Sequence, residues 1–463
     1  MGIFKDCDIR GVYGEDLTER EAAAIGTAVA EILHGRSIVV SGDFRTHTPA
    51  LKKAFTDALL TGGAEVLDIG QASTPQLYFS KRYLHTYASA QITASHNPPK
   101  YNGLKLMFGD LPVRPEDIAQ IGTRVEQILG GEKEKNPGKA PGIRNAATLE
   151  KDINQKAEKK DTTAAYETML LARLRPVTRK LHIVIDAGNG AMSEIAPRVA
   201  RKAGVEVTPL FCSYDGAFPN RDPNPAVLSH IAALCDKVKE TGADLGIAFD
   251  GDGDRAIFVD AAGRPLIAEE AMVIFTQALA KPGDSVVYDL KCSSILKQAI
   301  LRQGAEPVME RSGHAFIRRN FMQRNSVFAG EVSGHYFFRE LEGDDGLYAM
   351  MVMLDIMEET GKSLRELLSG VQYTAITPDI RIRASQEEIE AVLQRMEQWA
   401  GDPDVHPVYI DGIRLEFPDD SWLLLRRSIT EPAFTVRLEA PDEEKLQAMR
   451  RKAEERLQVQ LDF

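Results

Sequence analysis

The 463-residue sequence has few cysteines, which argues against a small secreted protein stabilised by several disulfide bonds. Its four cysteines, Cys7, Cys212, Cys235 and Cys292, are widely scattered and show no spacing typical of a zinc site. A chain of this size with so few cysteines does not depend on a disulfide framework. We therefore expect reduced thiols that act mostly as small core residues, and a cytoplasmic protein.

Long apolar runs and an excess of positive charge are also missing. The longest apolar stretches, near Ala271–Ala280 and Tyr348–Met353, fall short of the roughly 18 residues that a membrane span needs. The first residues lack the apolar core of a signal peptide, and Asp6 stands where a myristoylation signal requires Ser or Thr. With 56 basic and 68 acidic side chains, the net charge of −12 argues against nucleic-acid binding. We expect neither a membrane nor a nucleic acid as a partner.

The composition is that of a soluble globular protein with several domains. Hydrophobic residues make up 43% of the chain and charged residues 27%, which is ordinary for folded proteins. At about 150 residues per domain the length suggests about three domains, and two or four are also allowed.

A strand–helix–strand pattern occurs three times. In the first unit Ile38–Val40 predicts a buried strand, Thr48 is expected to cap the following helix, and Gly62 to end it. Strands predicted at His182–Asp186 and Ser285–Asp289 open the other two units. Each unit has an Asp near the end of its first strand and a Gly-x-Glu-like sequence after its helix. We interpret the pattern as three related α/β domains with right-handed crossovers.

Two other regions differ from this pattern. Gly131–Asp161 is rich in Lys and Glu and has no aromatic residue, so we expect a linker or surface excursion there. After about residue 370 we expect a fourth, α+β domain. Its predicted strands are Thr374–Ile382 and Phe434–Leu438, and its predicted helices are Glu387–Trp399 and Glu443–Leu457.

The strongest chemical signal is a loop with three carboxylates. Asp250, Asp252 and Asp254 alternate with glycines directly after the apolar strand Leu245–Phe249. They can converge only if a positive group lies among them, because their mutual repulsion is otherwise costly. A hard cation with oxygen ligands, Mg²⁺ above all, suits such a site. A calcium EF-hand is excluded because Arg255 stands where that loop requires Gly. A solvated acidic turn is the alternative.

A second loop presents a serine and a histidine. Ser95 and His96 lie in Thr93–Pro99, after a strand predicted at Ala88–Ile92. Adjacent residues on an irregular loop seldom face each other, and the Gly-x-Ser-x-Gly elbow is absent, so His96 is a doubtful base for Ser95. A serine beside a metal loop could instead carry a phosphoryl group, which Lys105 could approach. An ordinary structural loop is the alternative.

Two further loops give weaker signals. Gly330–His335 displays a carboxylate, a hydroxyl and an imidazole, which suit the hydroxyls of a sugar. Arg426–Thr430, with Arg437 further on, offers guanidinium groups and hydroxyls that suit a terminal phosphate. An ordinary turn and a solvated basic turn are the respective alternatives.

In combination these motifs resemble the α-D-phosphohexomutase family, most of all its bacterial phosphomannomutase/phosphoglucomutase branch. The resemblance spans essentially the whole chain, in the order Asp8–Gly11, Thr93–Pro99, Asp250–Arg255, Gly330–His335 and Arg426–Thr430. It implies an α/β protein in which three similar α/β domains with mixed sheets surround a central cleft and a C-terminal α+β domain closes over substrate. The expected domains are 1–150 with a phosphoserine loop, 151–256 with a metal loop, 257–370 with a sugar-binding loop and 371–463 with a phosphate-binding loop.

The resemblance also implies roles for individual residues. Ser95 would be a phosphoserine and would hold Mg²⁺ together with Asp250, Asp252 and Asp254. The catalytic candidates beside Ser95 are Arg10, Lys105 and His96. The substrate-binding candidates are Arg255, Lys291, His314, Glu331, Ser333 and His335, with Arg426, Ser428, Thr430 and Arg437 for the phosphate that is not transferred.

The implied function is the interconversion of hexose 1-phosphate and hexose 6-phosphate, of mannose and/or glucose. Phosphoserine would form an enzyme-bound 1,6-bisphosphate that turns end over end, and glucose 1,6-bisphosphate would act as activator. Lys105 could accept a proton only with a depressed pKa, which Arg10 and Arg255 would favour. The alternatives are a phosphoglucosamine mutase, a sugar-phosphate phosphatase and a binding pseudoenzyme. We expect a hexose phosphate as ligand and a monomer or weak dimer.

Two residues depart from the family pattern. Cys7 stands where an aromatic residue usually precedes the Asp-Ile-Arg motif, and Ile429 replaces the usual Asn of the phosphate loop, with Glu431 adding a negative charge. The loss of one hydrogen bond to a charged group weakens binding by about 1.5–3 kcal/mol. We therefore predict weaker substrate affinity than in a typical member.

Overall fold

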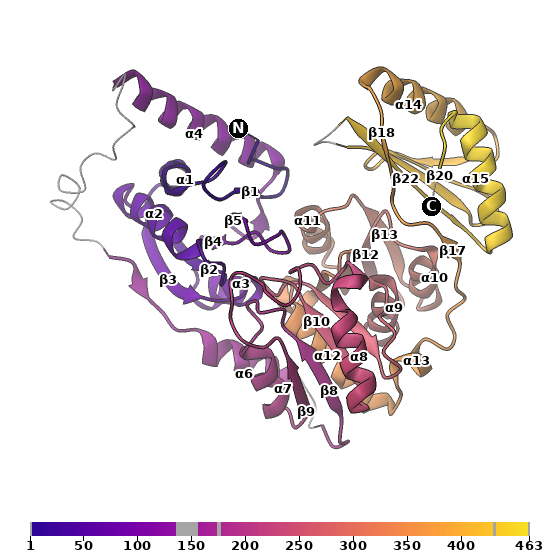
Figure 1. The fold of residues 1–463 in the computed structure, drawn as a ribbon, viewed down its shortest axis with the longest axis horizontal. Coiled ribbons are helices and arrows are strands. Elements are labelled where there is room, and N and C mark those ends of the chain that lie inside the picture. Colours follow the sequence, from indigo (N-terminus) through magenta and orange to yellow (C-terminus); the bar gives the residue numbers. More distant parts are fainter. Residues whose placement is uncertain (1, 136–155, 174–176, 429–431, 462–463) are drawn as a thin grey trace.

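The computed structural model describes residues 2–135, 156–173, 177–428 and 432–461, without the side chains of 131–135. Four sheets follow one another along the chain. Figure 1 shows them arranged in an arc, with the N-terminal and C-terminal units at its two ends. We call the first three sheets with their helices the first, second and third repeats, and the last sheet with its helices the C-terminal unit.

The three repeats are mixed sheets. In the first, the order is β1 (Ile9–Val12), β5 (Tyr101–Phe108), β4 (Ala88–Ile92), β2 (Ser37–Gly42), β3 (Glu65–Gln71) and β7 (Glu158–Lys159), with β6 (Leu111–Pro112) beside β5. In the second it is β11 (Ala256–Asp260), β10 (Leu245–Phe249), β8 (His182–Asp186) and β9 (Glu206–Leu210). In the third it is β13 (Glu306–Glu310), β12 (Ser285–Asp289), β14 (Phe328–Gly330), β15 (Tyr336–Phe338) and β16 (Gly343–Asp344).

The same four-strand arrangement occurs in every repeat. Its central strand, β2, β8 or β12, pairs in parallel with the next strand of the chain and with the one after that. An antiparallel strand, β5, β11 or β15, then lies beside the third parallel strand. The expectation of three similar α/β domains with mixed sheets is therefore confirmed.

Helices connect and cover these strands. The first repeat contains α1 (Glu19–Leu33), α2 (Thr48–Thr61), α3 (Thr74–Tyr83) and α4 (Pro115–Lys135). The second follows α6 (Thr163–Arg173) and contains α7 (Ile195–Lys202), η1 (Leu228–Ile231) and α8 (Ala232–Thr241). The third contains α9 (Ala268–Leu279), α10 (Ser294–Arg302), α11 (His314–Arg324), η2 (Arg339–Leu341), α12 (Gly346–Thr360) and α13 (Leu364–Leu367).

One local expectation in the first repeat is wrong. Thr48 does not cap α2: it is the first helical residue, and its hydroxyl instead donates to Asp43 at 2.6 Å. In the segment Gly131–Asp161, expected to be a linker or surface excursion, residues 131–135 form the end of α4 and Glu158–Lys159 form β7, which pairs with β3. Residues 136–155 of that segment lie outside the described residues.

Apolar side chains form one core in the first repeat and a shared core in the next two. The first-repeat core includes Leu51 and Phe55 of α2 against the sheet. A larger cluster contains β8 and β10 side chains of the second repeat, α9 of the third, and most of α12, which is apolar on every face in its first turns. A helix that is apolar all round must be buried, so α12 joins the second and third repeats through one continuous core.

The C-terminal unit is a sheet with two helices on it. Its strands are β17 (Ala375–Ile376), β18 (Ile380–Arg383), β19 (His406–Val408), β20 (Ile413–Glu416), β21 (Trp422–Arg427) and β22 (Ala433–Ala440), and its helices are α14 (Gln386–Ala400) and α15 (Glu443–Leu457). The single strand expected at Thr374–Ile382 is divided in two, because Pro378 has no N–H for the ladder with β22. The fourth α+β unit is otherwise as expected.

A buried carboxylate joins the C-terminal unit to the third repeat. Glu439 of β22 accepts hydrogen bonds from the backbone N–H of Ser294 at 2.9 Å, from the Ser293 hydroxyl at 2.6 Å and from the Trp422 indole. Ser293 is the N-cap of α10, where an anion is favoured by the helix dipole. The junction is therefore built on a helix terminus.

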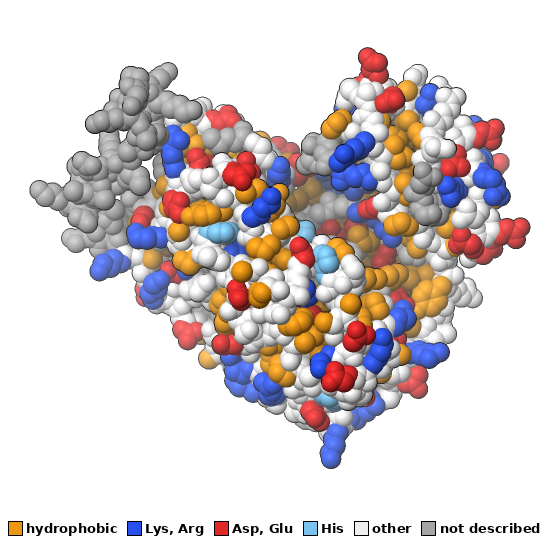
Figure 2. All heavy atoms as spheres, viewed as in Figure 1, with side chains coloured by type: hydrophobic (Ala, Val, Ile, Leu, Met, Phe, Trp, Pro, Cys, Tyr) orange, Lys and Arg blue, Asp and Glu red, His pale blue; other side chains and the backbone are white. Residues whose placement is uncertain are grey.

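Between its two ends the molecule is hollowed. Figure 2 shows this hollow between the first repeat and the C-terminal unit, which stand apart on either side of it. No helix among the described residues is long and apolar enough to cross a membrane.

Candidate active site

The three motif loops occupy equivalent positions in the three repeats. Thr93–Lys100 joins β4 to β5, Asp250–Arg255 joins β10 to β11, and Glu331–His335 joins β14 to β15. Each loop therefore follows the third parallel strand at its carboxyl end, which is where α/β sheets place their ligand sites. The loops also contact one another. The Ser95 hydroxyl donates a hydrogen bond to Asp250, and Arg255 forms a β-bridge with His335.

The acidic loop is a tight turn stabilised by its own first carboxylate. Asp250 Oδ1 accepts the backbone N–H groups of Gly253 at 2.9 Å and Arg255 at 3.2 Å. Gly253 adopts φ = +82°, a conformation that favours glycine. Burial, followed by the charges of Asp252 and Asp254, raises the pKa of Asp250 well above its ordinary value.

The three aspartates fit a divalent cation. All three are fully buried, and one oxygen from each lies within 4.8 Å of the others. Among the described residues, Oδ1 of Asp252 and Oδ1 of Asp254 are buried without a hydrogen-bond partner. An all-oxygen set of this kind suits a hard cation such as Mg²⁺ or Ca²⁺ and is unsuited to a soft metal. The cluster could therefore hold a divalent metal ion.

Ser95 is held against this cluster in an uncommon backbone conformation. It is completely buried and has φ = +49°, in the left-handed region. Its N–H donates to Thr93 Oγ1 at 2.8 Å, and its hydroxyl donates to Asp250 Oδ2 at 2.8 Å. The serine oxygen therefore lies at the edge of the acidic cluster.

His96 lies next to the serine but makes only a long contact with it. The Nδ1 atom of His96 is 3.4 Å from Ser95 Oγ. Burial, together with Arg255 and Arg10, lowers the pKa of His96 well below its usual range. The imidazole is thus kept uncharged by the cations around it.

Two cations from the first repeat complete this part of the site. Lys105 donates to Asp252 Oδ2 at 2.8 Å and to Asp254. Arg10 donates to Asp8 at 2.8 Å and to the Asn97 side chain at 2.7 Å, which ties it to the serine loop.

The expectation that Lys105 has a depressed pKa is wrong for this structure. Burial acts in the expected direction, but Asp252 and Asp254 outweigh it and raise the pKa of Lys105 well above its ordinary value. Arg10 and Arg255 are not the dominant neighbours. Lys105 is therefore held as an ammonium group among carboxylates.

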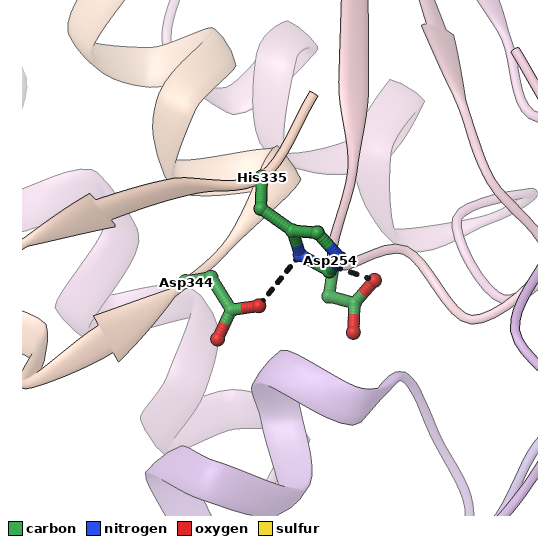
Figure 3. Close-up of side chains that lie close together, drawn as sticks. All are labelled: Asp254, His335 and Asp344. Carbon is green, nitrogen blue, oxygen red and sulfur yellow. Dashed lines mark ion pairs between the residues drawn. The ribbon is translucent and has the colours of Figure 1, made fainter. Parts of the chain in front are cut away.

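A histidine of the third repeat connects the acidic loop to a further carboxylate. Arg255 Nε donates to His335 Nε2 at 2.9 Å, so the ring proton is on Nδ1. Nδ1 lies 2.7 Å from Asp344 Oδ2 and 3.7 Å from Asp254 Oδ1, and Figure 3 shows the imidazole between the two carboxylates. We interpret the trio as direct polar contacts between the imidazole and the two carboxylates.

The remaining third-repeat candidates lie around the same region. Among the described residues, Glu331 Oε2 and Ser333 Oγ are buried without a hydrogen-bond partner. The His314 ring stacks on His335 with centroids 5.6 Å apart, and burial lowers the pKa of His314 to about 4. Lys291 is drawn toward the C-terminal unit by an ion pair with Asp379 at 3.1 Å.

The C-terminal candidates fall into two places. Arg426 pairs with Asp411, and the Ser428 hydroxyl accepts a hydrogen bond from Arg381 at 3.3 Å. Arg437 instead donates to the Thr377 carbonyl at 3.2 Å and lies 3.9 Å from Glu269, at the junction with the third repeat. Ile429, Thr430 and Glu431 lie outside the described residues.

Cys7 lies at the contact between the first and third repeats. An added Cβ on Gly313 would be 3.4 Å from Cys7 Sγ, so the thiol packs beside the loop that precedes α11. Burial, then the charges of Asp8 and Glu331, raises the pKa of Cys7 to about 12. The thiol is therefore protonated and unreactive at neutral pH.

Two residues of the site have no clear sequence signal. Thr74, at the start of α3, donates its hydroxyl to Asp252 Oδ2 at 2.6 Å and its N–H to the Asp252 carbonyl at 3.0 Å. Asp344 pairs with His335, which holds the pKa of Asp344 well below its usual range although burial opposes this. A Thr-Pro helix start and an Asp-Asp before an apolar helix are normally capping signals, so neither sequence points to a site.

Comparisons with known proteins show which proteins this chain is similar to. Residues 1–130, 165–263 and 268–373 match the sequence families described as phosphoglucomutase/phosphomannomutase, alpha/beta/alpha domains I, II and III. A phosphomannomutase/phosphoglucomutase of Pseudomonas putida is 32% identical over 455 residues, 97% of this chain and 94% of the relative. A phosphoglucomutase of Neisseria gonorrhoeae is 33% identical over 449 residues, 95% of this chain and 93% of the relative.

The same similarity is found among solved structures. The X-ray structure of a phosphoglucomutase/phosphomannomutase family protein from Burkholderia thailandensis is 29% identical, with a TM-score of 0.85. The match covers 99% of this chain and 98% of that one, so the similarity includes the C-terminal unit as well as the three repeats.

Proposed function

Because the chain belongs to the phosphoglucomutase/phosphomannomutase family, we propose that Ser95 carries the phosphoryl group exchanged between the two ends of a hexose. The protein is a hexose phosphate mutase. The observation that carries the assignment of Ser95 is its 2.8 Å contact with Asp250, which places a buried hydroxyl at the edge of the acidic cluster. A serine that only stabilised the loop would not need to be in contact with that cluster.

We assign the metal site to Asp250, Asp252 and Asp254 together with an oxygen of the serine phosphate. Mg²⁺ is the cation that we expect, and when bound it offsets negative charge on the transferring phosphoryl group. Lys105 already lies among these carboxylates, and we propose that its ammonium group binds the same phosphate. We propose the same role for Arg10, which is tied to the serine loop through Asn97.

The reaction then needs two transfers in which bonds balance. In the first, a hexose hydroxyl oxygen attacks the phosphorus of phosphoserine, an O–P bond forms on the sugar and the Oγ–P bond of Ser95 breaks. In the second, Ser95 Oγ attacks the other phosphorus of the bound 1,6-bisphosphate, an Oγ–P bond forms, the sugar O–P bond at that phosphorus breaks, and the freed sugar oxygen takes up a proton; phosphoserine is regenerated. The proton of the attacking hydroxyl passes to a base, for which His96 is a candidate because its imidazole is uncharged.

In this proposal the third repeat and the C-terminal unit supply most of the binding groups, and Arg255 comes from the second repeat. Glu331 Oε2 and Ser333 Oγ, both buried without a partner among the described residues, would bind sugar hydroxyls. Arg255, Lys291, His314 and His335 would contact the sugar and its reacting phosphate. The distal phosphate would be bound by Arg426 and Ser428, with Thr430 and Arg437 as further candidates.

Finer points of the function rest on the same proposal. We expect mannose and glucose phosphates as substrates, glucose 1,6-bisphosphate as activator, and a cytoplasmic monomer or weak dimer that binds no nucleic acid. We also retain the domain limits 1–150, 151–256, 257–370 and 371–463 as a working division. A phosphoglucosamine mutase and a phosphatase are the alternatives that the assay below distinguishes.

The test is a coupled assay with Mg²⁺ and a trace of glucose 1,6-bisphosphate. Mannose, glucose and glucosamine 1-phosphates would be compared for conversion to the 6-phosphates, and released inorganic phosphate would be measured in parallel. We expect turnover of mannose and glucose phosphates, its loss on treatment with EDTA, and its return with Mg²⁺. Phosphate release without isomer formation would instead indicate a phosphatase.

Two serine variants of the same strand–loop segment complete the test. S95A is expected to abolish turnover, because the phosphoryl carrier is removed. S89A is the matched control, since Ser89 lies in β4, is equally buried and has no hydrogen-bond partner for its hydroxyl among the described residues. Activity retained in S95A, or lost equally in S89A, would refute the role of Ser95.

A further inference from the structure

One buried arginine contacts much of the backbone of the serine loop. Arg45 is 1% exposed and lies just after β2. Its Nη2 donates to the carbonyls of Ser95 at 2.7 Å and Asn97 at 2.6 Å. Its Nη1 donates to the carbonyls of Pro98 at 2.9 Å and Tyr101 at 3.1 Å. Three backbone carbonyls of the serine loop and that of Tyr101, the first residue of β5, therefore converge on a single guanidinium group.

The fifth donor of Arg45 is used to orient it. Arg45 Nε donates to Asp43 Oδ2 at 3.1 Å, so all five N–H bonds of the guanidinium have an acceptor. Asp43 is itself fully buried and accepts from Thr93 Oγ1 at 2.7 Å and Thr48 Oγ1 at 2.6 Å. Thr93 Oγ1 is the acceptor for the Ser95 N–H. The pair thus holds Ser95 through both its carbonyl and its N–H.

Ser95 needs such support because its conformation is unfavourable by itself. A residue other than glycine with positive φ persists only where surrounding contacts determine its conformation. At φ = +49° Ser95 is such a residue, and its hydroxyl must reach Asp250 in the next repeat. The Ser95 carbonyl also packs against Gly251, where an added Cβ would be 2.5 Å away. A shift of this carbonyl would therefore move the serine relative to the acidic loop.

The second repeat is fitted to the same arginine. The Phe218 ring lies 5.0 Å from the Arg45 guanidinium carbon, and Phe44 stacks on Tyr214 with ring centroids 3.8 Å apart. Gly216 approaches so closely that an added Cβ would be 2.4 Å from the Thr46 nitrogen. The segment around Arg45 is thus confined on two sides, by the serine loop and by the second repeat.

We propose that Arg45 is a positioning residue for phosphoryl transfer: oriented by Asp43, it holds the serine loop and the start of β5 by four carbonyls and keeps Ser95 Oγ at the acidic cluster. This inference rests on the proposed function of Ser95 as phosphoryl carrier. Arg45 touches no reacting atom. Its effect is on geometry, and a displacement of about 1 Å at a reacting group can lower a rate by roughly 100-fold.

Lysine cannot replace this arginine. The three donors of an ammonium group radiate from one nitrogen, whereas the guanidinium directs five donors in a planar fork. R45K therefore keeps the charge opposite Asp43 but loses contacts with the loop carbonyls. We expect kcat of R45K to fall roughly 10- to 100-fold with KM for glucose 1-phosphate changed less than about threefold, because sugar-binding groups lie on other repeats.

K52M is the matched control within the same repeat. Lys52 is a similarly enclosed cation, 13% exposed, that donates to the Gly70 carbonyl at 2.7 Å and pairs with Asp68 at 2.6 Å, both outside the serine loop. Its removal is expected to lower thermal stability while kcat stays within about threefold of wild type. A loss of kcat in K52M equal to that in R45K would refute a specific role for Arg45.

Two readouts separate positioning from general stability. In R45A, millimolar ethylguanidinium is expected to restore part of kcat, whereas ethylammonium is expected to restore none. In R45K, amide hydrogen exchange measured by mass spectrometry is expected to accelerate in peptides covering 93–101, and K52M is expected to leave those peptides unchanged. Unchanged exchange there, or a change confined to KM, would overturn the proposal.

The exchange measurement also distinguishes this proposal from the one on which it rests. If wild-type protein turned over no hexose phosphate, the proposed function would fail, and faster exchange at 93–101 in R45K would still show that Arg45 holds the loop. If wild-type protein were active and R45K equally active, only the positioning role would fail.

Discussion

The first and third repeats differ in how the carboxylate at the end of the central strand is paired. Asp43, just after β2, is paired with Arg45, and both of its oxygens accept hydrogen bonds. Asp289, at the end of β12, accepts the Lys291 N–H at 3.0 Å and the Ser312 hydroxyl at 2.7 Å, both through Oδ1. Among the described residues its Oδ2 is buried without a hydrogen-bond partner, and no Lys or Arg side chain pairs with it.

The second repeat resembles the first in this respect. Asp186, at the end of β8, pairs with the buried Arg221, whose Nε donates to it at 2.8 Å. Arg221 also donates to the Phe249 carbonyl at 2.7 Å, one residue before the acidic loop begins. The two repeats that contain Ser95 and the acidic loop thus each have a buried aspartate–arginine pair that hydrogen-bonds to the backbone in or next to that loop.

The difference follows from what each loop has to do. Phosphoryl transfer requires that the serine and the acidic loop keep one mutual geometry, and fully satisfied buried polar networks are rigid. A loop that binds a sugar in two orientations gains from polar groups that are free to accept its hydroxyls. We therefore interpret the aspartate–arginine pairs as contacts that fix the geometry of the serine and the acidic loop. We interpret the unpaired Asp289 as part of a binding surface whose polar groups can contact the sugar in either orientation.

The largest effect is expected when the paired carboxylate is neutralised. In D43N the Arg45 guanidinium loses its buried counter-charge, so we expect the free energy of unfolding to fall by about 3–5 kcal/mol. The serine loop should also loosen, with a fall in kcat at least as large as in R45K. Urea denaturation and the coupled mutase assay measure the two effects.

The control for D43N is an exposed ion pair of the same repeat. Asp57 pairs with Lys53 on the surface of α2, and such pairs contribute about 0–1 kcal/mol. D57N should therefore unfold close to wild type and keep full kcat. A stability loss in D43N no larger than in D57N would contradict the role of the Asp43–Arg45 pair in holding the serine loop.

A smaller effect is expected at the unpaired carboxylate. In D289N the amide can still accept hydrogen bonds from Lys291 and Ser312 through its remaining oxygen, so stability should change by less than about 1 kcal/mol. If Oδ2 accepts a hydrogen bond from substrate, KM for glucose 1-phosphate should rise up to about tenfold, with kcat less affected. Equal losses of kcat in D43N and D289N would abolish the contrast between the two repeats.

The sequence predicted the repeats and their loops because both leave local patterns. Each of these patterns can be recognised within a short stretch of sequence: the apolar strands, the helices that end at glycine, and the alternation of Asp with Gly in Asp250–Asp254. The structure brings Ser95 and Asp250 together because their loops are equivalent in two repeats of one topology. That the two loops meet was predicted through the family resemblance, which the order of the motifs along the chain made specific.

The contacts that hold the serine loop could not be predicted from the sequence, because they form between residues that lie far apart along the chain. Arg45 contacts carbonyls 50 to 56 residues further along the chain, and backbone carbonyls have no sequence signature. Thr48 looked like a helix cap because its preference for caps is local, whereas Asp43 is the partner that it has in the fold. The raised pKa of Lys105 likewise depends on Asp252 and Asp254, about 150 residues away.

A second carboxylate of the third repeat gives the most specific prediction. Asp345, at the N-terminus of α12, accepts hydrogen bonds from Tyr166 at 2.7 Å and from the Tyr348 N–H at 2.9 Å. No Lys or Arg among the described residues pairs with it, and burial raises the pKa of Asp345 from 3.8 to about 7.

This shift has a definite sign. Between about pH 4 and pH 7 the folded state keeps a proton that the unfolded state has released, so the contribution of Asp345 to stability is fully present at low pH and is lost as the pH rises through about 7. D345N has no such titration and can make similar hydrogen bonds. Relative to wild type, the free energy of unfolding of D345N should therefore rise from pH 5 to pH 8 by about 1 kcal/mol or more. Urea denaturation at both pH values measures this difference. D57N is the control, and we expect it to show no such difference because the carboxylate that it removes is not buried. No difference between the two pH values would mean that Asp345 is already charged in the folded protein at pH 5. The third repeat would then hold a buried carboxylate charge without the arginine that the first two repeats use.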